Sequence, residues 1–145
     1  MFTFYSFNRL SHSIDFILLK KFFKKRINEI YEKYKDKKLV LVDDISNFFG
    51  LESSGVWKVR GNGVLILTED ELFFGMWKPK IDLVISIKSI IKVLNPKSYM
   101  HRSVFRLLLK VVFTNNNGVV DSAAWYVRKL DDWNKVLNKL ILKDR

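Results

Sequence analysis

The chain of 145 residues has no cysteine and contains only two histidines. The absence of cysteine excludes disulfides, thiolate metal sites and a cysteine nucleophile, and it fits a reducing compartment. Neither His12 nor His101 belongs to a recognisable catalytic Ser-His-acid arrangement in the sequence, and no His-x-x-x-His spacing occurs. We therefore expect a protein that is not an enzyme and that holds no metal and no cofactor.

Long apolar runs are also missing from the sequence. Spanning a bilayer takes about 20 consecutive apolar residues, and the longest such run near the N-terminus covers residues 16–19. Residues 1–10 lack the pattern of a secretory signal, because the charge follows the apolar part and no small-residue cleavage site is present. A phosphate loop is not expected either, since Gly61-Asn62-Gly63 lacks the third glycine and the following helix. We expect a soluble or peripheral protein in the cytoplasm, at the inner face of the membrane when it binds there.

Negative charge is scarce compared with positive charge. The 26 basic and 15 acidic residues give a formal net charge of +11. Residues 1–40 contain ten Lys and Arg against four Asp and Glu, so the first quarter of the chain is disproportionately basic. Such a surplus attracts polyanions, either anionic lipid headgroups or nucleic acid, without choosing between them.

An amphipathic helix is predicted over residues 13–34. Its apolar residues recur at spacings of three and four and so share one face: Phe16, Leu19, Phe23, Ile27, Ile30 and Tyr34. The candidate contact residues for a membrane or a partner are Lys20, Lys21, Phe22, Phe23, Lys24, Lys25 and Arg26. Basic residues flanking an apolar stripe are typical of a helix that lies in an anionic interface. The alternative is that the stripe packs on the rest of this protein or on another subunit, while the lysines face water.

Short strand-like segments fill most of the remaining sequence. Seven of them are predicted, at residues 55–60, 64–68, 72–77, 81–86, 89–94, 104–113 and 119–127. The segment 104–113 has the clearest alternation, and Gly61-Asn62-Gly63 is predicted as a tight hairpin turn because Asn-Gly supplies positive φ values. Residues 39–42 could form a further strand, residues 45–54 are expected to be an irregular covering loop, and an amphipathic helix begins near Asp131.

Three segments in this order resemble GRAM-type domains of the pleckstrin-homology-like superfamily. They are the hairpin at residues 65–74, the isoleucine-rich step at residues 85–91, and the last strand with its capping helix, from Asp121 to Trp133. The resemblance covers about residues 52–142. It implies a mainly β (α+β) fold, in which a seven-stranded, two-sheet, partly open barrel is capped by a C-terminal helix that inserts Trp133. The barrel domain would span residues 39–145, after an N-terminal basic amphipathic helix and linker at residues 1–38.

The same resemblance implies binding of phosphoinositides, other lipids, peptides or partner proteins. One candidate phosphate site lies at the first and third hairpins: Lys58, Arg60, Lys78 and Lys80. A second basic group lies in the polar loop at residues 95–103, with Lys97, His101 and Arg102 beside the candidate insertion side chains Tyr99 and Met100. The simpler interpretation of both groups is a solvated strand face and a solvated loop.

These observations predict a non-catalytic binding module. Its expected ligand is an anionic lipid surface or a protein partner. One alternative is a nucleic-acid-binding protein that uses the same basic surface, although no paired exposed aromatic residues that would stack on bases are evident. Another is a structural or interaction protein that forms homo-oligomers through the N-terminal helix.

Overall fold

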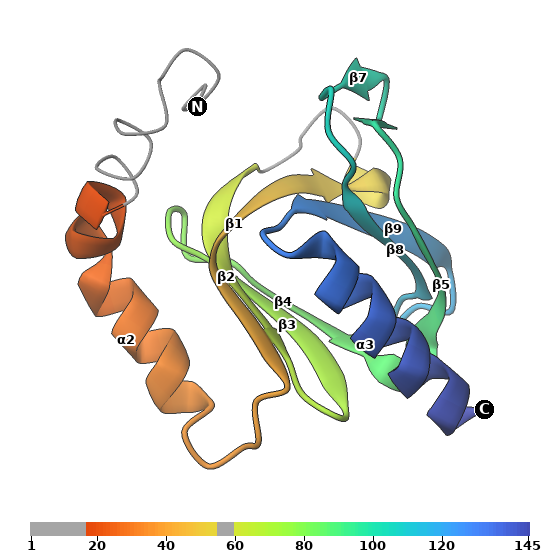
Figure 1. The fold of residues 1–145 in the computed structure, drawn as a ribbon, viewed down its shortest axis with the longest axis horizontal. Helices are drawn as coiled ribbons and strands as arrows, with labels where there is room; N and C mark the ends of the chain where they lie inside the picture. Colours follow the sequence, from red (N-terminus) through yellow and green to blue (C-terminus); the bar gives the residue numbers. More distant parts are fainter. Residues whose placement is uncertain (1–16, 55–59) are drawn as a thin grey trace.

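The computed structural model describes residues 17–54 and 60–145. A strongly curved antiparallel sheet separates two helices, α2 (Lys24–Lys33) on its outer side and α3 (Leu130–Asp144) on its inner side (Figure 1). The sheet has the strand order β4-β3-β2-β1-β9-β8-β5. Its strands are β1 (Leu41–Leu51), β2 (Gly61–Leu67), β3 (Glu71–Met76), β4 (Asp82–Ser86), β5 (Ile90–Leu94), β8 (Leu109–Thr114) and β9 (Val120–Tyr126). The structure confirms a mainly β fold with a C-terminal helix.

The long strand β1 joins the two halves of the sheet. Its first part pairs with β2, from Leu41 opposite Leu67 to Phe48 opposite Gly61, and its last part pairs with β9. Register shifts interrupt both pairings, and such irregularities bend a strand and increase its twist. The sheet is therefore continuous through β1 rather than divided into two.

The central strand β2 is buried on both of its faces. Leu65 and Leu67 point into the inner core, whereas Val64 and Ile66 point into the outer one. A strand covered on both faces reads as an unbroken apolar run in the sequence. This explains why residues 64–67 are four consecutive apolar residues that are 0% exposed.

Helix α3 closes the inner side of the sheet. Its buried residues Trp133, Leu137 and Ile141 recur at intervals of four and join a core that draws on all seven strands of the sheet and on the short turn η3 (Ile87–Ser89). Trp133 is 2% exposed. The prediction that this indole is inserted into the interior is confirmed.

The predicted apolar stripe of the N-terminal helix lies against the outer side of β1, β2 and β3. Residues 17–22 are helical, a turn occurs at Phe23, and α2 follows. Ile27, Ile30 and Tyr34 are buried among Ile45, Val64, Ile66, Phe73 and Trp77, and Leu19 and Phe23 are partly buried at the same site. The packed alternative therefore accounts for the described part of the stripe.

The predicted hairpin turn at Gly61-Asn62-Gly63 is wrong, because these residues begin β2. Gly63 pairs with Ser46 on one side and with Met76 on the other. A Cβ at this position would lie 2.4 Å from the carbonyl oxygen of Gly75 and 2.6 Å from the Phe74 ring. The glycine is needed for a close approach inside the sheet, and not for a turn. Most of the strand predicted at residues 55–60 lies outside the described residues, and Arg60 itself is not in a strand.

Two further boundaries differ from the predictions. Residues 45–51, expected in a covering loop, belong to β1, because the register shift between Asp43 and Ser46 breaks the alternation that would have indicated a strand. The strand predicted at residues 104–113 begins only at Leu109, since the backbone at Phe105 is left-handed, with φ of 56°. The strand predicted at residues 64–68 begins three residues earlier, at Gly61. The strands predicted at residues 72–77, 81–86, 89–94 and 119–127 and the start of the C-terminal helix agree with the structure to within one residue.

Candidate functional site

A short hairpin projects from the sheet between β5 and β8. Its strands β6 (Ser98–Tyr99) and β7 (Arg102–Ser103) pair only with each other, and they stand clear of the sheet at the top of Figure 1. Two backbone bonds close its base, from Val104 N–H to the Lys97 carbonyl and from Leu108 N–H to the Pro96 carbonyl, both 2.9 Å between N and O. We call residues 97–107 the tip.

Buried side chains fix the tip to the sheet. Tyr99, Val104 and Leu108 are between 0% and 8% exposed and pack with Phe49 and Ala124. The Tyr99 hydroxyl lies 2.8 Å from the Ser122 carbonyl oxygen and 3.1 Å from that of Gly50. Burial raises the pKa of Tyr99 to about 12, so the hydroxyl stays protonated and can donate. The prediction that Tyr99 inserts into a membrane is therefore wrong, because this side chain anchors the tip.

Other apolar side chains of the tip face solvent. Phe105 is 88% exposed and Leu107 is 48% exposed. Three non-glycine residues of the tip, Met100, His101 and Phe105, have positive φ values between 51° and 67°. A left-handed backbone conformation at a non-glycine residue costs about 1 kcal/mol or more in conformational free energy, and it persists where the surrounding structure imposes it. The anchored tip thus holds Phe105 in water on a left-handed backbone.

Basic residues occupy the same tip as this exposed phenylalanine. Lys97, His101, Arg102 and Arg106 are all exposed, and residues 83–120 contain no Asp or Glu. The guanidinium of Arg106 lies 5.0 Å from the ring centre of Tyr126 and donates a hydrogen bond of 2.7 Å to the Tyr126 hydroxyl. Arg106 is thereby fixed beside Phe105. The tip combines an apolar projection with a basic surrounding.

The other predicted phosphate ligands do not form a comparable group. Lys58 lies outside the described residues. Arg60 places its guanidinium 4.6 Å from the ring centre of Phe49, and Lys80 pairs with Glu29 at 3.1 Å. Lys78 is exposed and lies at the same end of the sheet as Arg60, as predicted, because β2 begins where its partner β3 ends. Among the described residues, these cations contact protein groups or point to solvent.

The predicted basic residues of the N-terminal helix divide into two sets. Lys20 pairs with Asp44 at 2.8 Å, and Arg26 donates both to the Met76 carbonyl and to Asp82, at 2.9 and 2.7 Å. Partial burial favours a raised pKa for Asp82, but the hydrogen bond and charge of Arg26, together with Lys33, lower it overall. Phe23 stacks on Trp77, 5.1 Å between ring centres. Lys21, Phe22, Lys24 and Lys25 remain exposed.

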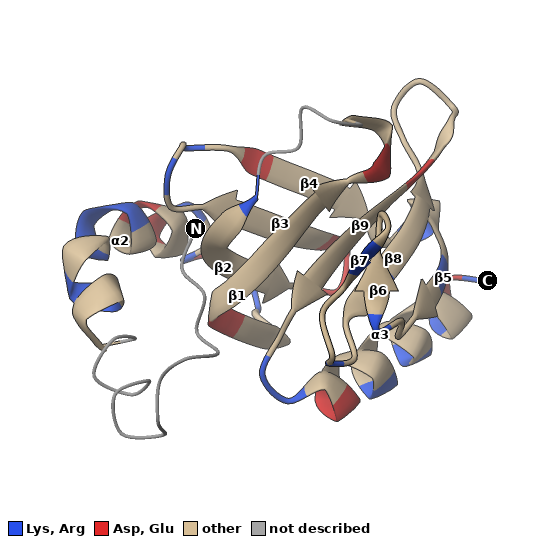
Figure 2. Cartoon of the chain, turned by 90° about the horizontal axis from the view of Figure 1, so that it is seen from above, with Lys and Arg blue, Asp and Glu red and all other residues tan. Residues whose placement is uncertain are grey.

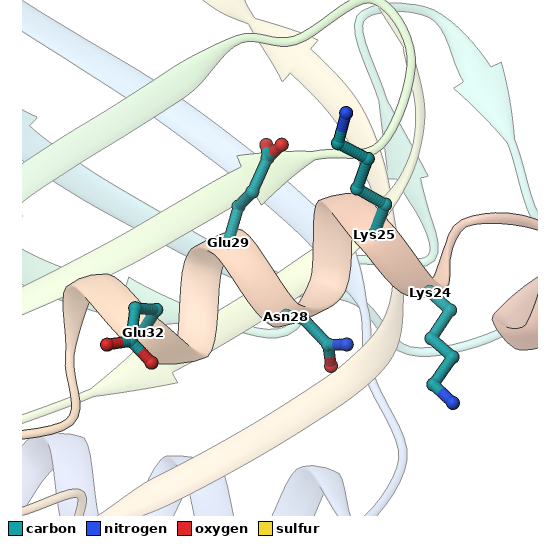
Figure 3. A pocket seen from close by; sticks show the side chains of 5 residues that line it. All are labelled: Lys24, Lys25, Asn28, Glu29 and Glu32. Atoms are coloured by element: carbon teal, nitrogen blue, oxygen red, sulfur yellow. The ribbon is translucent and has the colours of Figure 1, made fainter.

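Two hollows lie on the surface of the described residues. A cleft of about 230 Å³ lies between β1 and α3 and includes Asp43, Arg128 and Trp133. The buried Asp43 carboxylate accepts hydrogen bonds from the backbone N–H groups of Ile45 and Arg128 and from Arg128 Nε, so it fastens β1 to the start of α3. The second hollow is lined by side chains of one helix only, Lys24, Lys25, Asn28, Glu29 and Glu32 (Figure 3), so no second element encloses it.

Other basic side chains lie on separate parts of the surface. Figure 2 shows Lys and Arg at β7, along α2 and along α3. Within the described ranges, no group of three His, Asp or Glu side chains could hold a metal ion. No helix in those ranges is long and apolar enough to cross a membrane.

Comparison with known proteins gives the fold and no activity. No protein-family model matches the sequence, and no curated protein matches it. The structure is similar to a crystal structure of the C-terminal domain of an unknown protein from Leishmania infantum, with a TM-score of 0.55 and 15% sequence identity. The match covers 86% of this chain and 98% of that one.

Sequence reasoning found the basic residues Lys97 and Arg102 of this site and missed its apolar part. Phe105 and Leu107 alternate with Arg106, and this pattern predicts a strand. The absence of acidic residues over 83–120 was the available signal that this region differs from the rest of the surface.

Proposed function

We propose that this protein is a non-catalytic binding module that associates peripherally with an anionic lipid surface through the tip. The observation that carries the proposal is Phe105, which is 88% exposed on a hairpin anchored by buried Tyr99, Val104 and Leu108. A basic loop with an exposed apolar side chain can place that side chain among lipid tails and its cations among headgroup phosphates.

The expected binding energy is modest and comes from both kinds of contact. Burying Phe105 contributes about 2 kcal/mol and half-exposed Leu107 about 1 kcal/mol. Each cation close to an anionic leaflet adds about 1 kcal/mol, so Lys97, Arg102 and Arg106 add about 3 kcal/mol. The sum of about 6 kcal/mol corresponds to an apparent Kd of tens of micromolar. This is the range of reversible peripheral association.

The lipid class follows from how the cations are arranged. They lie around an outward projection and not around a cleft, so they recognise net negative charge more than one headgroup. We propose a cytoplasmic location for the same reason, because the cytoplasmic leaflet carries the anionic lipids. We also propose that the fold is pleckstrin-homology-like. The support is the run of seven antiparallel strands followed by a C-terminal helix with Trp133 in the core.

The test is co-sedimentation of the full chain with vesicles of phosphatidylcholine alone and of phosphatidylcholine mixed with phosphatidylserine. We expect binding to the mixed vesicles only. Phe105→Ser should weaken it about 30-fold, since about 2 kcal/mol is lost. Val119→Ser is the matched control, because Val119 is 58% exposed on a different hairpin, and it should bind as the wild type does.

The charge contribution is tested with Arg102→Glu in the same assay. This variant should bind at least tenfold more weakly at low salt, and the difference from the wild type should shrink as salt is added. Equal sedimentation with both vesicle types, or wild-type affinity of Phe105→Ser, would refute the proposed function.

A further inference from the structure

We infer that the exposed side of residues 17–25 is a second lipid-contacting surface, which binds the same anionic leaflet as the tip. We call it the helix face, and it consists of Ile17, Leu18, Lys21, Phe22, Lys24 and Lys25. The inference rests on the proposed function, and it adds a second contact from a different element of the fold.

The helix face carries apolar side chains that stay largely exposed in the described part of the chain. Ile17 is 64% exposed, Leu18 58% and Phe22 80%. Helical periodicity explains this, since residues 17, 18, 21, 22 and 25 lie on one side and residues 19, 23, 27 and 30 on the other. The second group packs on the sheet. The helix therefore has apolar residues on two sides. One side packs on the sheet, and the other is exposed and also carries lysines.

The charged residues within residues 17–25 are all lysines. Lys21, Lys24 and Lys25 are exposed, and no ion pair within the described part of the chain involves them. Figure 3 shows Lys24 and Lys25 pointing away from the helix in different directions. In the part of the helix that the structure describes, the acids that follow the helix face are Glu29 and Glu32, which pair with Lys80 and Lys35. Asp44 of β1 pairs with Lys20.

Charge complementarity selects an anionic bilayer as the occupant. A second copy of the chain docked here about a twofold axis would bring these three lysines against the same three lysines, which is repulsive. A leaflet with phosphatidylserine offers negative charge to the lysines and a hydrocarbon layer to Phe22, Leu18 and Ile17. A second contact on the same molecule reinforces the first where both surfaces reach the leaflet together, and labels at positions 22 and 105 test this condition.

Because the chain contains no cysteine, single introduced cysteines can report the position of the helix face. Phe22→Cys and Phe105→Cys are each labelled with a polarity-sensitive fluorophore and mixed with phosphatidylcholine–phosphatidylserine vesicles. Leu142→Cys is the matched control, because Leu142 is 72% exposed and lies on α3. We expect the emission to shift to the blue for the labels at 22 and 105 and to stay unchanged for the label at 142.

The contribution of the lysines is measured by co-sedimentation of unlabelled variants. Lys21→Ala with Lys25→Ala should weaken binding about 30-fold, at about fivefold for each cation lost near the surface. Lys135→Ala with Lys139→Ala removes the same charge from exposed positions on α3 and should weaken binding less than threefold. Equal losses in the two pairs would mean that net charge alone matters, and this result would overturn the inference.

The outcomes separate this inference from the function on which it rests. A label at 105 that shifts while the label at 22 does not would overturn the helix face and leave the tip as the lipid contact. A label at 22 that shifts with protein concentration in the absence of vesicles would overturn it in favour of self-association. If no variant or wild-type protein sediments with anionic vesicles, the proposed function fails and the inference fails with it.

Discussion

The contact between Ile30 of α2 and Gly75 of β3 allows the docking of the N-terminal helix to be tested energetically. Ile30 is 1% exposed. A Cβ placed on Gly75 would lie 2.5 Å from Ile30 Cδ1 and 3.0 Å from its Cγ1. A methyl group at position 75 therefore overlaps the isoleucine unless that side chain moves, and the two positions should be strongly coupled.

The magnitudes follow from the packing. Gly75→Ala overpacks the interface and should cost about 1–2 kcal/mol of unfolding free energy. Ile30→Ala leaves a cavity and should cost about 3 kcal/mol. Independent effects would add to about 4–5 kcal/mol. We expect the double variant to cost only about 3 kcal/mol, because the methyl at 75 occupies space that the shortened residue 30 vacates.

The assay is urea unfolding followed by tryptophan fluorescence, with a coupling energy of about 1–2 kcal/mol as the expected result. The control cycle combines Gly75→Ala with Ile27→Ala. Ile27 is 7% exposed on the same helix face and is not among the atoms nearest to the added Cβ, so this cycle should be additive within about 0.5 kcal/mol. Strict additivity in the Ile30 cycle would refute the docking of α2 on β3.

Three further predictions concern the sheet and its polar contacts. Gly63→Ala should lower the Tm and cost more than about 2 kcal/mol, because backbone at Gly75 cannot yield to a Cβ at 2.4 Å, and an unchanged Tm would contradict the strand assignment. Asp43→Asn should cost about 2 kcal/mol in urea unfolding, since a buried carboxylate that accepts three hydrogen bonds is replaced by an amide; a cost near zero would contradict its role. The pKa of Tyr99 is raised from 10.0 to about 12, so its contribution to stability is complete below pH 10 and is lost as the pH rises through about 12. The stability difference between wild type and Tyr99→Phe should fall by about 2 kcal/mol over this interval, and a constant difference would show that Tyr99 titrates normally.

Local patterns in the sequence predict those helices and strands whose buried residues recur at a regular spacing. The apolar run at residues 64–67 predicts β2, because a strand buried on both faces needs consecutive apolar residues. The spacing of four between Trp133, Leu137 and Ile141 predicts α3, because a helix that packs on a core buries one face. The strand β1 could not be predicted in the same way, since Asp43 is a buried acid whose partner Arg128 lies 85 residues away. Its register shift also removed the alternation on which the assignment of a strand depends.

The features of the fold and of the site that the sequence does not predict depend on tertiary contacts. Asn62-Gly63 is a strong local turn signal, and only the proximity of Phe74 and Gly75 shows why glycine is required inside a strand. Phe105 has the alternation of a core residue, yet its backbone is left-handed and its side chain is exposed. The sequence predicts the basic character of the tip, but it places the apolar projection at Tyr99 and Met100, whereas Phe105 and Leu107 are the exposed apolar residues.

The two-sided pairing of β1 has a consequence for the order in which the molecule folds. Its partner β2 follows soon after it in the chain, but the pairing of Asn47 with Tyr126 must bring together distant parts of the sequence. Closing such a long loop costs chain entropy before the contact repays it, so the β2–β3–β4 meander should form first and the junction with β9 late. Hydrogen exchange should accordingly reveal slower protection at the β9 end of β1 than at its β2 end during refolding.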